Sequence, residues 1–314
     1  MLRGFRIESG RLQQLEDATV HSACQWFDLV APDEKERTLL DRKFGGVVPG
    51  TEEMEEIEAS SRYYTDEDGI HVNSLFLYRA EGFSRNGTVA FTLSDERLIT
   101  VRDVELPDFR LLRLRARNVP VKVRHPLGIM LALFEQKVDH LADELEDLYG
   151  ELEKVSRTVL MEEETTEDLE DDIDLLGQVE DTNGKVRLCL LDTQRAIPWL
   201  MRHIRDDPDA LEACREILRD AESLLAHTTF VFEKVNFLMA AAQGFISIKQ
   251  NQIIKIFSIA AVVFLPPTLV ASIYGMNYAH MPELQWEYGY PFALCLMVLA
   301  GIAPYLFFKR KGWL

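Results

Sequence analysis

The sequence has few of the features that mark an enzyme or a secreted protein. Its four cysteines are far apart, with no CxxC pair and no histidine at zinc-finger spacing, so we expect reduced core residues. The first 125 residues contain no phosphate-binding glycine loop, no nucleophile elbow and no HExxH motif, which favours a binding or regulatory module over an enzyme. Charged residues interrupt the first eight positions, where a signal peptide would need an apolar run.

Basic residues are also scarce, and they are unevenly distributed. The chain has 34 Lys and Arg against 52 Asp and Glu, a formal net charge of −18. After Asn251 there are four basic and two acidic residues, a net charge of +2, so the first 250 residues carry −20. The strong negative charge of the first 250 residues argues against nucleic acid as a partner and is compatible with binding of divalent cations.

The pattern of short segments predicts an α+β fold that begins with a cytoplasmic α/β domain over residues 1–125. Runs of β-prone residues are separated by polar turns, and two polar-apolar stretches have helical spacing. The expected strands are Gly69–Tyr78, Thr88–Leu93 and Leu98–Val101, and the expected helices are Glu52–Arg62 and Phe109–Arg117.

Residues 126–250 are expected to form a cytoplasmic helical stalk. Apolar residues there alternate spacings of four and three, which predicts a coiled-coil seam over more than three heptads. The seam consists of Phe134, Val138, Leu141, Leu145, Leu148, Leu152, Val155 and Val159. The acidic run Glu162–Asp174 is expected at a hairpin tip, and Leu169–Arg205 predicts a second, antiparallel helix that contains Pro198.

A long third helix is expected to begin at Asp207-Pro208, with the aspartate as cap and the proline in the first turn. The next proline is Pro266, and Gly244 is the only glycine between them. One helix of roughly 85 Å, at about 1.5 Å per residue, could therefore couple the soluble part to a membrane.

Residues 251–314 predict a membrane domain with two spans, about 253–274 and 290–308. Each apolar run has about 19 to 21 residues, enough to cross a hydrocarbon core of about 30 Å. Lys249 and Lys255 lie at the start of the first span and Lys309-Arg310-Lys311 follow the second, whereas the loop between the spans has no Lys or Arg. The basic residues therefore predict that both termini are cytoplasmic.

On a helical wheel of about 100° per residue, the uncharged polar residues of the first span share one face with some apolar ones. The face contains Asn251, Ile254, Ser258, Ala261, Leu265, Thr268 and Ser272. Two readings stay open, helix packing through small residues and the lining of a pore. Because two helices per chain cannot enclose a conduit, a pore requires an oligomer, in which Leu265 with Phe257 or Ile254 would form apolar rings that gate by dewetting.

Two adjacent prolines, Pro266 and Pro267, lie inside this first span. Each removes a backbone donor, at a cost of about 3 kcal/mol in an ordinary helix. A kink or a tightly packed interface is expected to compensate.

The chain resembles the CorA magnesium transport proteins, specifically their proteobacterial branch, over essentially its whole length. The resemblance is carried by Tyr274-Gly275-Met276-Asn277, by Met281-Pro282-Glu283-Leu284 and by the two spans with their basic tail. It implies a funnel-shaped homopentamer in the bacterial inner membrane lipid, with both termini inside. It also implies uptake of Mg²⁺, with Co²⁺ and Ni²⁺ as lesser substrates, along the electrochemical gradient and without ATP.

The resemblance further implies that Gly275, Met276 and Asn277 form the selectivity filter. It places Asn251, Leu265 and Thr268 in the pore. Mg²⁺ gives up its water shell reluctantly, so a ring of neutral oxygens can bind the hydrated ion and still release it. Glu283 and Glu287 in the outer loop would raise the local cation concentration, or they are simply solvated.

Family members are regulated by intracellular Mg²⁺ bound between neighbouring cytoplasmic domains. The candidate ligands here are Glu55 and Glu56 on an N-terminal helix and Glu216 and Asp220 on the long helix. The alternative for each acid is an exposed, solubilising charge. Mg²⁺ would bridge subunit faces of like charge, so a fall in its concentration would loosen the closed assembly.

Two other functions remain open at this point. One is a Zn²⁺ transporter of the same superfamily, which shares the architecture. The other is a membrane-tethered cation sensor, which would need an output partner that the sequence does not contain.

The motif leads to a direct prediction. Asn277→Ala is expected to abolish uptake in a magnesium-dependent strain, because the ring loses its amide oxygens, while the protein still inserts and assembles. Growth of the strain without added Mg²⁺ measures the effect, and normal growth of the variant would contradict the filter role.

Overall fold

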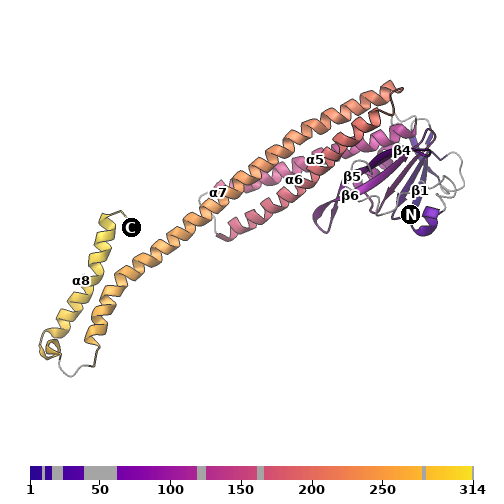
Figure 1. Cartoon of the computed structure of the whole chain (residues 1–314). Coiled ribbons are helices and arrows are strands. Elements are labelled where there is room, and N and C mark those ends of the chain that lie inside the picture. The colour runs from indigo at the N-terminus through magenta and orange to yellow at the C-terminus, as the bar shows by residue number, and fades with distance from the viewer. Residues whose placement is uncertain are drawn as a thin grey trace. The chain divides into compact units, whose positions relative to one another are not determined.

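Figure 1 shows the computed structural model, which describes residues 1–8, 11–15, 24–38, 62–118, 125–160, 166–277 and 281–312. Most of the helix expected over Glu52–Arg62, with Glu55 and Glu56, lies outside these residues. The chain divides into two compact units, Met1–Met239 and Ala240–Leu314.

The first unit begins with a mixed seven-stranded sheet in the order β2-β1-β3-β7-β6-β5-β4. Neighbouring strands are antiparallel except for β3 and β7, which pair in parallel with Trp26 opposite Leu98. The strands are β1 (Leu2–Glu8), β2 (Arg11–Leu15), β3 (Trp26–Val30), β4 (Tyr63–Asp66), β5 (Gly69–Ala80), β6 (Phe83–Leu93) and β7 (Leu98–Arg102). The three expected strands are confirmed.

The strands β5 and β6 extend beyond their expected ends because they form one long hairpin. The turn between Ala80 and Phe83 consists of Glu81 and Gly82, both with positive φ, at 55° and 84°. Two such residues make the turn whose twist matches that of antiparallel strands.

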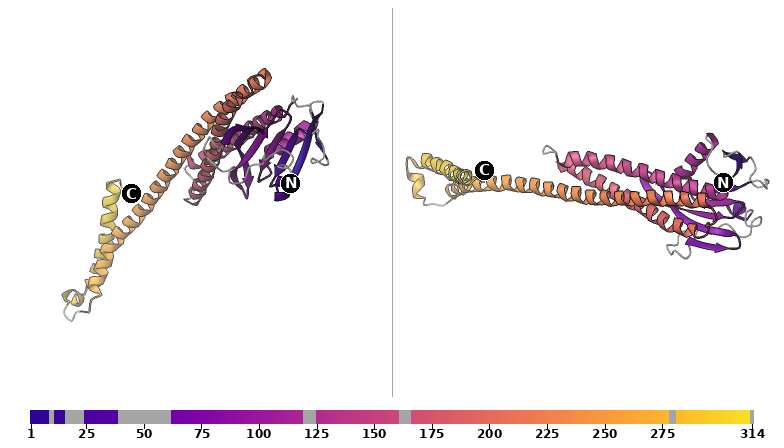
Figure 2. Two further views of the ribbon diagram at one scale, coloured as in Figure 1. Left: turned by 45° about the vertical axis from the view of Figure 1, so that its right-hand side comes forward. Right: turned by 90° about the horizontal axis from the view of Figure 1, so that it is seen from above.

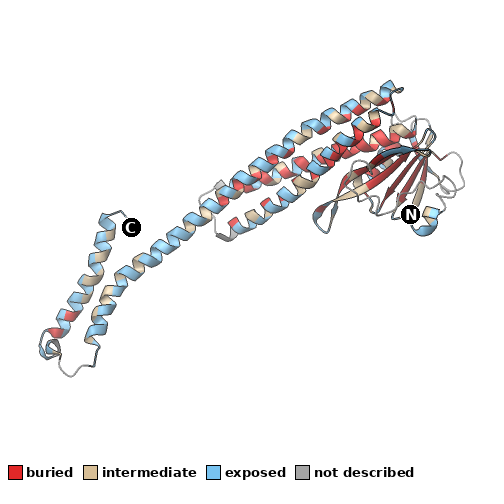
Figure 3. Cartoon of the chain, in the orientation of Figure 1, coloured by how far each residue is buried: buried red, intermediate tan, exposed pale blue. Residues whose placement is uncertain are grey.

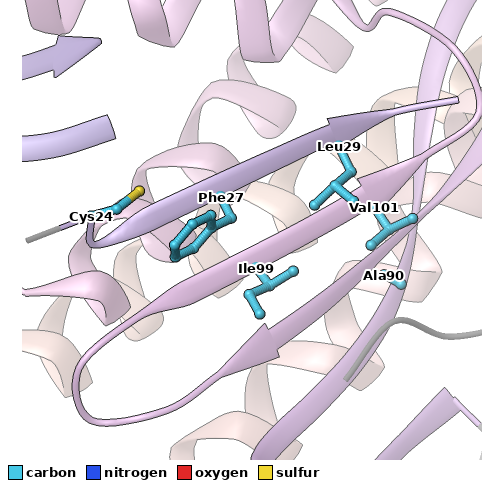
Figure 4. Close-up of a cluster of buried hydrophobic side chains, with 6 residues drawn as sticks. All are labelled: Cys24, Phe27, Leu29, Ala90, Ile99 and Val101. Atoms are coloured by element: carbon cyan, nitrogen blue, oxygen red, sulfur yellow. The ribbon is translucent and has the colours of Figure 1, made fainter. Parts of the chain in front are cut away.

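The sheet is held by a core of apolar side chains from strands that are distant in the sequence. One cluster, shown in Figure 4, contains Cys24, Phe27, Leu29, Ala90, Ile99 and Val101. Cys189 and Cys214 are buried too, as expected, whereas the expectation was wrong for Cys295, which is exposed on a helix of the second unit. There the surrounding run is apolar on every side, so an apolar neighbourhood in sequence did not mean a buried one.

Helices follow the sheet. They are α4 (Pro107–Asn118), α5 (Pro126–Leu160), α6 (Thr166–Met201), α7 (Pro208–Tyr274), the short 3₁₀ helix η1 (Pro282–Gln285) and α8 (Gly289–Arg310). Figures 1 and 2 show α5 and α6 side by side as an antiparallel pair, and both contact the sheet. Four aromatic rings join the sheet to the helices α4 and α5, namely Phe76, Phe91, Phe109 and Phe134.

The heptad seam predicted for α5 is confirmed. All eight of its apolar residues, from Phe134 to Val159, are buried. The helix α6 ends at Met201 instead of Arg205, since a turn follows in which the His203 amide donates to the Leu200 carbonyl at 2.9 Å. Of the acidic run expected at a hairpin tip, residues 162–165 lie outside the described residues, and the acids from Glu167 to Asp174 belong to the first turns of α6, where the positive end of the helix dipole favours them.

The long helix predicted from Asp207-Pro208 is also confirmed. The Asp207 carboxylate accepts a hydrogen bond from the Ala210 amide at 3.0 Å, and α7 then continues for 67 residues through Pro266 and Pro267. The end of α7 and the whole of α8 are long and apolar enough to cross a membrane, and almost none of these two windows is buried. Figure 3 shows the contrast with the buried residues of the sheet and of α5.

A buried charge network ties β3 and β7 to α4. The side chains of Asp28 and Arg102 are fully buried and form an ion pair, Arg113 donates to Asp28 at 3.0 Å, and the Thr100 hydroxyl donates to Asp28 at 3.0 Å. The Arg102 guanidinium also lies 3.8 Å from the centre of the Phe109 ring. Each charge is therefore compensated in a region that water does not reach.

We predict that Asp28→Ala lowers the free energy of unfolding by about 3 kcal/mol, because, among the described residues, the buried Arg102 keeps only the half-exposed Glu105, at 3.4 Å, as an ion-pair partner. The control is Glu96→Ala, which breaks a surface pair with Arg97 and should change stability by less than about 0.5 kcal/mol. Denaturant unfolding of the purified chain in detergent, followed by circular dichroism, measures both. Equal effects would contradict the role of the buried pair.

Candidate functional site

The motif Gly275-Met276-Asn277 follows directly on the last residue of α7. The Gly275 amide donates to the Ala271 carbonyl at 2.9 Å and the Met276 amide donates to the Ile273 carbonyl at 3.3 Å, so the chain still turns as it leaves the helix. All three residues are exposed in the single chain. They therefore stand at the negative end of the helix dipole, which favours a cation.

The predicted pore face of α7 is exposed along its whole length. This face, which we call the polar arc, spans about 0° to −100° on the wheel that starts at Asn251, with Phe257 at about −120°. Its residues are Asn251, Ile254, Phe257, Ser258, Ala261, Leu265, Thr268 and Ser272, and each is exposed. Leu265 and Phe257 expose 68% and 72% of their surface, which in a membrane protein leaves them for lipid or for another chain.

The opposite side of α7 is half-buried, and at Val263 and Pro267 it lies against Gly301 of α8. From Ile259 to Tyr274, the half-buried residues all lie between about 60° and 180° on the same wheel, and every other residue is exposed. The half-buried residues are Ile259, Ala260, Val263, Pro266, Pro267, Val270 and Tyr274. The tertiary structure thus leaves the polar arc open and brings Pro267 against the neighbouring helix.

One polar group of the arc is already bound to the backbone. The Thr268 hydroxyl donates to the Phe264 carbonyl at 2.7 Å. Since its hydrogen is committed there, the oxygen can present only its lone pairs on the open side. A threonine held in this way acts as an acceptor and suits water of a hydrated cation.

The outer loop is described in part. Glu287 is exposed, and the side chain of Glu283 lies outside the described residues. Trp286 contacts the rings of Tyr288 and Phe292 at the start of α8. Clustered aromatic rings at the end of an apolar helix are typical of a membrane interface.

In the first unit, the helices α5 and α7 place acids close enough to affect one another. Partial burial and the charges of Asp139, Glu216 and Asp220 raise the pKa of Glu135 above the ordinary carboxyl range. Partial burial and the charges of Asp143 and Asp220 likewise raise the pKa of Asp139, although Arg115 on α4 lies 3.8 Å away and opposes the shift. The predicted acids Glu216 and Asp220 therefore face a second acidic pair.

Glu135 and Asp139 were missed by the sequence reasoning. The sequence signal for these two acids is that each directly follows a seam residue, Phe134 or Val138. Each therefore lies at the edge of the packed face of α5. Within the part of the chain that the structure describes, no three acidic, histidine or cysteine side chains meet in a geometry that could hold a metal ion. One chain by itself therefore brings the acids near one another without forming a closed set of ligands there.

A cavity of about 660 Å³ lies between α6 and the strands β4 to β6. Its most buried polar group is the Asp192 carboxylate, which accepts hydrogen bonds from Ser74 at 2.5 Å and from the Leu75 amide at 2.9 Å and pairs with Arg62 and Lys137. These donors already satisfy Asp192, so the group serves to hold the sheet to α6.

Comparison with known proteins gives a consistent result. The family described as "CorA-like Mg2+ transporter protein" matches residues 21–310. The magnesium transport proteins CorA of Salmonella typhimurium and of Escherichia coli K12 are 51% and 50% identical to this chain, and each alignment covers all of both chains. The complete structure of the CorA magnesium transporter from Methanocaldococcus jannaschii has a TM-score of 0.78 and 18% identity, covering 100% of this chain and 99% of that one, and confirms the fold.

The acidic cluster gives a prediction on stability. An acid whose pKa is raised in the folded state opposes folding once the pH exceeds its ordinary value, and this opposition disappears as the pH falls below it. Glu135→Gln should therefore raise the melting temperature of the purified chain at pH 7 without divalent cations, and the gain should be lost near pH 4.

Glu146→Gln is the control, because Glu146 is an exposed acid on the same helix. It should leave the melting temperature nearly unchanged at both pH values. A loss of stability on replacing Glu135 would mean that its charge has a stabilising partner and would contradict the repulsion.

Proposed function

Since the chain belongs to the CorA family of Mg²⁺ transporters, we propose that it is a channel through which Mg²⁺ enters a bacterial cell along the electrochemical gradient. Mg²⁺ transport is supported by about half identity over the full length with curated magnesium transport proteins. Co²⁺ and Ni²⁺ are proposed as lesser substrates. The driving force is the membrane potential and the concentration difference, so no ATP is needed.

The proposed assembly is a homopentamer in the inner membrane, with both termini in the cytoplasm. In each chain, residues 1–125 form the α/β domain, 126–250 the helical stalk and 251–314 the membrane domain. Five copies of α7 would surround one conduit, since two membrane helices cannot enclose one alone. The basic residues at the inner ends of both spans support this orientation.

The observation that carries the proposal is the division of α7 into two faces. The arc that contains Asn251, Ser258, Thr268 and Ser272 is exposed, and the side opposite to it is covered by α8. Polar groups in a bilayer need protein or water beside them. In the proposed pentamer the polar arc meets the water of the pore, and α8 lies on the lipid side.

The proposed filter is the ring of Gly275, Met276 and Asn277 at the outer end of α7. Five Asn277 amides and nearby backbone carbonyls supply neutral oxygens that can bind the outer waters of a hydrated Mg²⁺. Neutral oxygens hold the ion weakly enough to release it, and the negative ends of five helix dipoles add attraction at the same place. Glu283 and Glu287 would concentrate cations outside.

Below the filter, the apolar residues of the arc provide a gate. Rings of Leu265, Phe257 and Ile254 would exclude water when the helices are close together and admit it when they separate. We propose that cytoplasmic Mg²⁺ controls this change by bridging acidic faces of neighbouring subunits. Glu216 and Asp220, with Glu55 and Glu56 of a neighbour, are the proposed ligands, and Glu135 and Asp139 add negative charge beside them.

No specific observation on the described residues or among the reported relatives favours a zinc transporter or a membrane-tethered sensor. The curated relatives reported above are named for magnesium, and they are transport proteins. We therefore propose neither alternative as the function.

The proposal is tested by flux into liposomes that contain the purified protein. We expect Mg²⁺ uptake, measured with an internal Mg²⁺ dye, that rises when a potassium gradient makes the interior negative and falls when internal Mg²⁺ is raised. External Zn²⁺ should compete poorly with Mg²⁺. The control is the Asn277→Ala variant in the same liposomes, which should give the background of empty vesicles.

Each other outcome has a clear meaning. No cation flux from assembled protein would contradict the channel and favour a sensor. Zn²⁺ uptake that exceeds Mg²⁺ uptake would overturn the substrate, and uptake independent of internal Mg²⁺ would overturn the proposed regulation alone.

A further inference from the structure

The two adjacent prolines of α7 leave two backbone carbonyls without their helical donors. In a regular helix the amide of a residue donates to the carbonyl four residues earlier, and proline has no amide hydrogen. Because α7 continues through Pro266 and Pro267, the carbonyls of Val262 and Val263 lose these bonds. In hydrocarbon no water can replace the lost donor, so another part of the protein must do so.

Gly301 of α8 lies against one of these carbonyls. A methyl group added at Gly301 would be 3.3 Å from Cγ of Pro267 and 3.7 Å from the carbonyl oxygen of Val263. The α-hydrogen that takes the place of the methyl group therefore points toward both atoms. A glycine at this position therefore lets α8 pack closely against the Pro267 ring, beside the Val263 carbonyl.

The rest of the α8 face supports the close approach. Its buried and half-buried residues are Gly289, Ala293, Met297, Ala300, Gly301, Pro304 and Phe308, and the other residues of α8 are exposed. Small residues at such spacing let two membrane helices come near enough for backbone contact. Gly301 is a glycine of this face, and a methyl group added there would meet both the proline ring and the free carbonyl.

The position of this contact around α7 matters. On the wheel that starts at Asn251, Val263 lies at about 120° and Pro267 at about 160°, whereas the centre of the polar arc lies at about −60°. The contact with Gly301 is therefore on the side opposite the polar arc. A contact there determines the rotation of α7 and so the direction in which the arc faces.

We propose that Gly301 is a positioning residue that holds α8 against Pro267 and the free Val263 carbonyl, so that the polar arc of α7 faces the ion path. The ion path is part of the proposed channel function, so this inference rests on that function. The contact between the two helices can be tested without any flux measurement. The contact places α8 against the proline ring and so fixes the rotation of α7.

The first experiment compares two glycine-to-alanine variants of the full chain. Gly301→Ala should lower the melting temperature of the assembled protein in detergent and reduce Mg²⁺ uptake, since the added methyl group would lie 3.3 Å from Pro267 Cγ and would push the two helices apart by a few tenths of an ångström. Gly244→Ala is the matched control, because Gly244 is a helical glycine of α7 with open space around its would-be methyl group. It should leave both quantities unchanged or raise stability slightly.

The second experiment is a double-mutant cycle with Pro267→Ala. This change removes the Cγ atom that a methyl group at position 301 would meet most closely, so the reason for a glycine there no longer applies. In the Pro267→Ala background, Gly301→Ala should therefore cost far less melting temperature than in the original chain. An equal cost in both backgrounds would overturn the proposal.

A third measurement separates orientation from mere stability. In a Cys295→Ser background the remaining native cysteines are buried, so single cysteines can be introduced at Ser272 on the arc and at Val270 on the covered side. A water-soluble thiol reagent should label position 272 much faster than position 270. Gly301→Ala should reduce this ratio and Gly244→Ala should not.

These results distinguish the two proposals. If the cycle and the labelling agree with expectation but liposomes show no flux, the contact stands and the channel function fails. If Mg²⁺ enters normally and the labelling ratio is unchanged in Gly301→Ala, the positioning role fails and the channel function stands.

Discussion

The chain's second unit depends on the constraint that a backbone in hydrocarbon must satisfy its own polar groups, because lipid offers no donors or acceptors. Helix α7 meets this constraint with i to i−4 hydrogen bonds over its whole length except at Pro266 and Pro267. The exception falls on the side that α8 covers, where Gly301 approaches the Val263 carbonyl. Packing of α8 on that side in turn leaves the polar arc open. The same constraint therefore connects the prolines, the glycine and the orientation of the proposed ion path.

In the first unit, the dominant constraint is that charged side chains buried away from water need partners of opposite charge. A strongly acidic surface surrounds a core in which Asp28 and Asp192 are buried, and each is matched by buried or half-buried basic groups. On the surface, by contrast, Glu135 and Asp139 face Glu216 and Asp220, and partial burial and like charges raise the pKa of the first two. Repulsion of this kind opposes the folded state at neutral pH and is compatible with the proposed bridging of acidic faces by Mg²⁺.

Local patterns in the sequence were sufficient for much of the fold. The heptad of α5, the cap at Asp207 and the two apolar runs each depend on residues that are close in sequence, and the structure agrees with them. One kind of error occurred where the outcome depended on distant residues. The exposure of Cys295 is one example, since it depends on what packs nearby in space. The end of α6 was misplaced for a local reason, the turn in which the His203 amide donates to the Leu200 carbonyl.

The sequence by itself determined the two apolar spans, the polar arc, the Gly275-Met276-Asn277 motif and the family, because periodicity, composition and short motifs are local properties of the chain. Only the tertiary structure decided which side of α7 is covered by α8, that Gly301 meets Pro267, and that Glu135 and Asp139 face Glu216 and Asp220. These are contacts between residues separated by more than thirty positions. They depend on how whole helices rotate and pack against one another, which no local pattern of residues specifies.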